Sequence, residues 1–177
     1  MSPLTGWESF YVITGSAAAA LTGLTFVVIT LVAQSRVQSL GHGVAAFTSP
    51  TVVHFCVALL VSAILSAPWP TLSNAGPPLG LAGLAGVVYA LLVARRLWRF
   101  SGYRPDREDW LCYAALPFAA YTILVVAAIM LPSSPTMALF GIAAVTLVLL
   151  FIGIRNAWDT VTYVAIAHSE SQNESED

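Results

Sequence analysis

The chain has little charge and no lysine. Of its 177 residues 9% are charged and 58% are hydrophobic, and the seven basic residues are all arginines. Soluble domains carry about 25% charged residues, so this composition argues against a water-soluble fold. The formal net charge of −2 leaves no basic surface for nucleic acid, and we expect no nucleic-acid partner.

Signatures of catalysis and of disulfide-stabilised folds are also missing. The two cysteines, Cys56 and Cys112, lie in or beside apolar segments, where we expect them to pack and to form no disulfide. The sequence holds no glycine-rich phosphate loop, no HExxH or GxSxG motif and no paired carboxylates in an apolar segment. We therefore predict no enzyme activity, no metal site and no cofactor.

Long apolar stretches dominate what is present. They cover residues 10–33, 52–67, 79–98, 111–131 and 136–154. A helix of roughly 20 residues crosses ~30 Å of hydrocarbon, so four stretches have the required length and the second is short. Because backbone groups in lipid must pair internally, and because barrel-like alternation is absent, we predict α-helices. The expected fold class is all-α: one polytopic transmembrane helix bundle of five helices over residues 1–168.

The arginines predict the orientation of this bundle. Cytoplasmic loops accumulate arginine and lysine. Arg36 lies in the first connection, the cluster from Arg95 to Arg107 in or beside the third, and Arg155 after the fifth stretch, whereas the second and fourth connections are uncharged. With five crossings every arginine falls on one side. We predict a multi-pass protein of the bacterial inner (cytoplasmic) membrane, with the N-terminus outside and the C-terminus inside.

Prolines and the chain end refine the expected boundaries. Ser49 and Pro50 fit an N-cap and first-turn proline for the second helix. Pro117 should kink the fourth helix. The fifth helix should continue into the cytoplasm, and the acidic residues 169–177 should form a disordered tail.

Small residues make the first helix distinctive. Gly15, Ala19 and Gly23 recur every four residues and predict a groove in which another backbone packs closely. An adjoining strip presents the hydroxyls of Thr14, Thr22 and Thr25. One interpretation is packing within the chain, with the hydroxyls bonded to i−4 carbonyls. The other is that copies of this helix meet around an axis, or that the threonines line a wet path.

Other polar residues have similar alternatives. Glu8, outside the first helix, is either solvated or part of an acidic ring at a pore mouth. His54, inside the second stretch, is either a hydrogen-bonded interfacial residue or an intramembrane site that relays protons or holds a metal. Arg155 and Asp159 flank Trp158 at the inner boundary, where they either anchor the helix end or join neighbouring chains.

Two segments carry a resemblance to a known family. The stretches Trp7 to Val28 and Ile154 to Tyr163 resemble small membrane proteins typical of actinobacteria, a family with no known activity. A fainter similarity links Ala20 to Val28 with the pore helix of the Orai calcium channels. The pore glutamate of that family would fall at Leu31 here, and those subunits have four helices, so no calcium selectivity follows.

These observations lead to two functional hypotheses. The first is a membrane protein that self-associates through its first helix as a homo-oligomer and forms an ion or small-solute channel. The second is a non-conducting accessory subunit that docks onto another membrane protein through the first helix and the Arg95 to Arg107 loop. The lipid bilayer is the expected environment in both.

Overall fold

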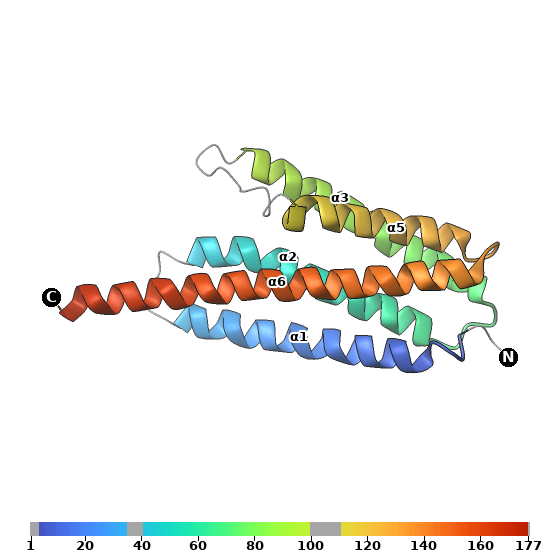
Figure 1. The fold of residues 1–177 in the computed structure, drawn as a ribbon, viewed down its shortest axis with the longest axis horizontal. Coiled ribbons are helices and arrows are strands. Elements are labelled where there is room, and N and C mark those ends of the chain that lie inside the picture. Colours follow the sequence, from blue (N-terminus) through green and yellow to red (C-terminus); the bar gives the residue numbers. More distant parts are fainter. Residues whose placement is uncertain (1–3, 35–40, 100–110, 177) are drawn as a thin grey trace.

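The computed structural model describes residues 4–34, 41–99 and 111–176, and the side chains of residues 4–30, 50–95, 112–159 and 161–162. The described residues form a bundle of helices without strands, which confirms the predicted all-α class (Figure 1). In chain order the elements are α1 (Glu8–Gln34), α2 (Gly41–Ser66), the 3₁₀ turn η2 (Leu72–Ala75), α3 (Gly76–Arg99), the π-helical turn η3 (Leu111–Ala115), α5 (Leu116–Met130) and α6 (Pro135–Glu176).

The helices have the length and composition of membrane spans. Among the described residues four segments are long and apolar enough to cross a bilayer: Glu8–Thr30, Leu72–Arg95, Cys112–Met130 and Pro135–Asp159. The apolar part of α2, Pro50–Ser66, is shorter. The chain is therefore an integral membrane protein, and its five long helices correspond to the five predicted stretches.

Two helix pairs lie against a central helix. α1 packs on α2, α3 packs on α5, and α6 contacts both α2 and α5. Figure 1 shows α6 running across α2, with α1 on one side and α3 and α5 on the other, and the start of α1 and the end of α6 at opposite ends of the bundle. An odd number of crossings is the arrangement that separates the termini in this way.

Three glycines set the closest helix contacts. A Cβ at Gly83 of α3 would lie 2.7 Å from Val125 Cγ2 on α5, and one at Gly86 would overlap the ring of Tyr121. A Cβ at Gly153 of α6 would likewise overlap the ring of Phe55 on α2. Small residues at such positions let helices approach in lipid, where association depends on packing.

Burial differs strongly between the spans. In the most apolar 18-residue window of α6, 56% of the residues are buried, against 17% in that of α1. The largest hydrophobic core joins α6 to α3 and α5. Its almost fully buried residues include Leu79, Leu124, Leu139, Ile142 and Leu149. α6 is thus the centre of the bundle, and α1 lies at its edge.

Pro50 and Pro117 lie within described helical segments. Pro50 lies inside α2, which begins at Gly41, so the expected helix start at Ser49 is wrong. Membrane helices tolerate such prolines because neighbouring groups satisfy the freed carbonyl. Pro117 lies in the first turn of α5, directly after the π-helical turn η3. The kink predicted at Pro117 stays a prediction.

α6 also runs further than expected. It continues beyond the membrane-spanning part, as predicted, but extends to Glu176, through residues that the sequence analysis assigned to a disordered tail. Adding a residue to an existing helix forms one hydrogen bond without a new nucleation cost, which explains why a polar segment can continue it.

Candidate functional site

The inward face of α1 packs against α2. Thr14 and Ala18 are 4% and 0% exposed. A Cβ at Gly15 would lie 3.0 Å from Ser62 Cβ, and the hydroxyls of Thr14 and Ser62 are hydrogen-bonded at 3.1 Å. The inward face of α1 therefore packs against α2 of the same chain.

The hydroxyls of the predicted threonine strip form hydrogen bonds within the chain. Thr14 donates to the Phe10 carbonyl oxygen at 2.9 Å, Thr22 to that of Ala18 at 2.8 Å, and Thr25 to that of Leu21 at 2.8 Å. Thr14 and Thr25 are also buried. This placement supports the packing interpretation of the strip rather than a wet path.

The predicted groove of Gly15, Ala19 and Gly23 is divided between two faces. Gly15 is buried against α2, whereas Ala19 and Gly23 are exposed, and a Cβ at Gly23 would meet nothing within 4 Å. A four-residue step advances about 40° beyond one full turn, because an α-helix has 3.6 residues per turn. The row therefore turns away from α2 and is already at the surface at Ala19 and Gly23.

A different row of small residues follows the outward face, and the sequence analysis missed it. Ser9, Ser16, Gly23 and Thr30 are all exposed and recur at exact seven-residue intervals. A seven-residue repeat stays nearly aligned along a helix and is the spacing of a coiled-coil seam. The spacing was readable in the sequence, but only the structure separates this face from the inward one. We call these four residues the outward seam.

Glu8 lies at the start of α1 and is exposed. A carboxylate in the first turn interacts favourably with the helix dipole. The preceding residue, Trp7, contacts α6 through the ring of Phe140, with centroids 4.7 Å apart. Glu8 is therefore held at the N-terminal end of the bundle, beside the first residue of the outward seam.

His54 is joined to a partner that the sequence did not indicate. It is 1% exposed, and its Nδ1 shares a 2.7 Å hydrogen bond with the hydroxyl of Tyr121 on α5, which is fully buried. Residues 67 positions apart are thereby joined. The described part of the chain has no group of three histidine, cysteine, aspartate or glutamate residues that could hold a metal ion.

Arg155, Trp158 and Asp159, which were predicted to anchor the inner end of the helix, lie in different environments. Arg155 donates from Nη1 to the sulfur of Cys112 in η3, a contact that the sequence analysis missed. Trp158 is 72% exposed, and Asp159 is partly exposed. Arg155 thus links α6 to η3, and Trp158 projects from the bundle.

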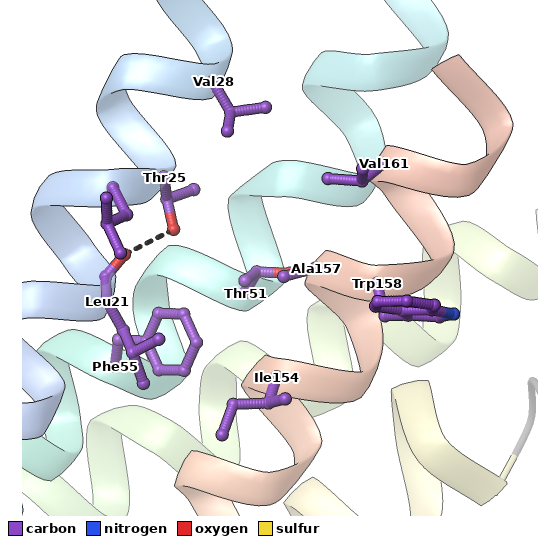
Figure 2. Close-up of a pocket in the computed structure, with 10 residues that line it drawn as sticks. Leu21, Thr25, Val28, Thr51, Phe55, Ile154, Ala157, Trp158 and Val161 are labelled. Atoms are coloured by element: carbon purple, nitrogen blue, oxygen red, sulfur yellow. Dashed lines mark hydrogen bonds between the residues drawn. The ribbon is translucent and has the colours of Figure 1, made fainter. Parts of the chain in front are cut away.

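An apolar cavity of about 230 Å³ lies between α1, α2 and α6 (Figure 2). Its lining includes Leu21, Thr25, Phe55, Ile154 and Trp158. Figure 2 shows the Thr25 hydroxyl directed to the Leu21 carbonyl oxygen. The lining carries no ionisable side chain and suits an apolar group, not an ion.

In comparisons with known proteins, no family model matches this chain, and no curated protein or solved structure matches it. The resemblance to small actinobacterial membrane proteins stays a prediction.

Proposed function

We propose that this integral membrane protein works as a homo-oligomer whose copies meet through the outward seam of α1. The observation that carries the proposal is a row of small residues on one helix: α1 has the smallest buried share of the four candidate spans, and its exposed face contains Ser9, Ser16, Gly23 and Thr30. Large apolar side chains of α1, among them Val12, Ile13 and Val27, are also exposed around these small residues, as Leu81, Ile129 and Phe151 are on the other helices.

Small residues on an unpaired span favour helix association. Glycine and serine let two backbones approach, so that van der Waals contact and interhelical hydrogen bonds replace contact with lipid tails. Polar contacts of this kind contribute about 0.6 kcal/mol each on average. The seven-residue spacing favours a left-handed crossing that runs the length of the helix.

An ion or small-solute conduit is the activity that such an assembly would support. A path on its axis would be lined by the outward seam, with Glu8 at one mouth. Thr14 and Thr25 would not take part, because their side chains are buried inside the chain.

The orientation proposed from the arginines is compatible with the described residues. Arg155 of α6 contacts η3, and η3 packs against α3, the helix that carries Arg95. We propose that this end faces the cytoplasm of a bacterial cell. Arg36 and the arginines from Arg96 to Arg107 lie outside the described side chains.

The first experiment is the mass of the protein in nanodiscs, with Gly23→Leu as the test variant. Leucine at Gly23 adds volume to the seam and touches nothing within the chain, so the oligomer should dissociate to folded monomers. Ala85→Leu adds the same side chain at an exposed small residue of α3 and should leave the oligomer intact.

The outcomes separate the two hypotheses from the sequence analysis. A defined oligomer that only Gly23→Leu disrupts supports the proposal and justifies ion-flux assays in liposomes. A wild-type monomer contradicts it and favours an accessory subunit, whose seam would be covered by a helix of another membrane protein. An oligomer that both variants leave unchanged places the interface elsewhere.

A further inference from the structure

His54 occupies an unusual place, at the meeting of the two helix pairs. It belongs to the α1–α2 pair, whereas its hydrogen-bond partner Tyr121 belongs to the α3–α5 pair. The ring centroids lie 5.8 Å apart, tilted at 39°. The contact therefore joins the two pairs beside α6 by a polar bond inside an apolar bundle.

The surroundings of Tyr121 hold this contact in one geometry. Gly86 of α3 lies against the Tyr121 ring so closely that any side chain there would overlap it. Tyr89, one turn further along α3, interacts electrostatically with Tyr121. Groups from α2, α3 and α5 thus converge on one polar position.

The second ring nitrogen of His54 has no hydrogen-bond partner among the residues that the structure describes. Nε2 is buried and forms no hydrogen bond with any described residue. A neutral imidazole has one donor and one acceptor nitrogen, and Tyr121 can satisfy only the one at Nδ1, whichever tautomer is present. Leaving a buried polar atom unpaired costs about 1–3 kcal/mol, and the bilayer offers no replacement partner.

We propose that Nε2 of His54 binds a single internal water molecule within the membrane-spanning bundle. Buried waters characteristically bond polar atoms that the protein leaves unpaired. Water is a donor and an acceptor, so it fits either tautomer of His54. A water at this position would also give His54 a partner for proton exchange inside the membrane. The inference does not depend on self-association, because His54 lies away from the outward seam of α1.

Solid-state NMR in lipid bilayers tests the water directly. The sample is the full chain labelled with ¹⁵N and carrying His42→Gln and His168→Gln, which leaves His54 as the single histidine of the three. The measurement is the rate at which magnetisation from water reaches the ring nitrogens. The backbone amide of Ala58, fully buried one turn along α2, is the dry reference, and the side-chain amide of Asn74, exposed in η2, is the wet reference.

The expected result is transfer to His54 Nε2 that is several-fold faster than transfer to the Ala58 amide and approaches that of Asn74. Transfer as slow as that of Ala58 overturns the proposal, because Nε2 would then be dry. Neither labelling nor the two glutamine substitutions changes a residue of the site, so folding of the sample does not decide the outcome.

Discussion

The two faces of α1 carry the same kinds of residue in different surroundings. The inward face places Thr14, Gly15 and Ala18 against α2, with their polar groups bonded inside the chain. The outward face places Ser16 and Gly23 at the surface, with open space beside Gly23. A small residue therefore indicates where another backbone can approach. It does not indicate whether that backbone belongs to the same chain or to another one. The inward face packs within the chain, and the outward face is exposed, where we propose that a second copy binds.

The sharpest test of this comparison is to place the same bulky residue on each face. Gly15→Leu should destabilise the folded chain, because even a Cβ at Gly15 lies 3.0 Å from Ser62 Cβ and α1 must move away from α2 to admit a leucine. Overpacking of this kind costs about 1–3 kcal/mol, and more where the backbone cannot shift. The measurement is an unfolding titration in bicelles, at a protein concentration that keeps the chain monomeric.

Gly23→Leu is the matched control in that titration and should unfold like the wild type. Equal destabilisation by both substitutions would mean that the two faces are not distinct. A stable Gly15→Leu variant would mean that α1 does not pack on α2 through Gly15.

The next test distinguishes specific contact through the outward seam from random collisions between α1 helices in the membrane. Ser16→Cys, in a Cys56→Ala background that removes the exposed native thiol, should form a disulfide-linked dimer on mild oxidation. Ala17→Cys should not, because residue 17 is exposed but lies about 100° around the helix. Disulfide formation requires Cα atoms about 4.4–6.8 Å apart, so yield on a denaturing gel reports which face is in contact.

Comparable yields at positions 16 and 17 would indicate random collision. A higher yield at position 17 would place the contact on another face of α1 and contradict the outward seam.

The sequence predicted the helices well and their partners poorly, for a physical reason. Hydrophobic length is a local property, so the spans followed from the apolar runs. Helix ends depended on context: Pro50 is tolerated inside α2, and the polar end of α6 continues a helix already formed. The hydrogen bond between His54 and Tyr121 could not be predicted, because it depends on which helices pack together. The spacing of apolar residues along one helix does not contain that information.

In the first helix, too, local interactions could be predicted from the sequence, whereas contacts with other helices could not. Thr14, Thr22 and Thr25 donate to i−4 carbonyls, a local interaction that the sequence alone can suggest. The four-residue spacing of Gly15, Ala19 and Gly23 predicts one groove, but a row with this spacing winds around the helix. Only the position of α2 shows that Gly15 faces inward and Gly23 outward.

The smallest expected effect concerns the hydrogen bond between Thr14 and Ser62. A double-mutant cycle of Thr14→Val and Ser62→Ala should give a coupling energy of about 0.6 kcal/mol, the average for interhelical polar pairs in membranes. The value is small because each hydroxyl keeps a carbonyl of its own helix as an alternative partner, Phe10 for Thr14 and Ala58 for Ser62. The matched cycle pairs Ser62→Ala with Thr22→Val, because Thr22 bonds to the Ala18 carbonyl on its own helix, and its coupling should be close to zero. Equal coupling in both cycles would show that Thr14 is not a specific partner of Ser62, and the inward face would then be held by close packing at Gly15 and Ala18 alone.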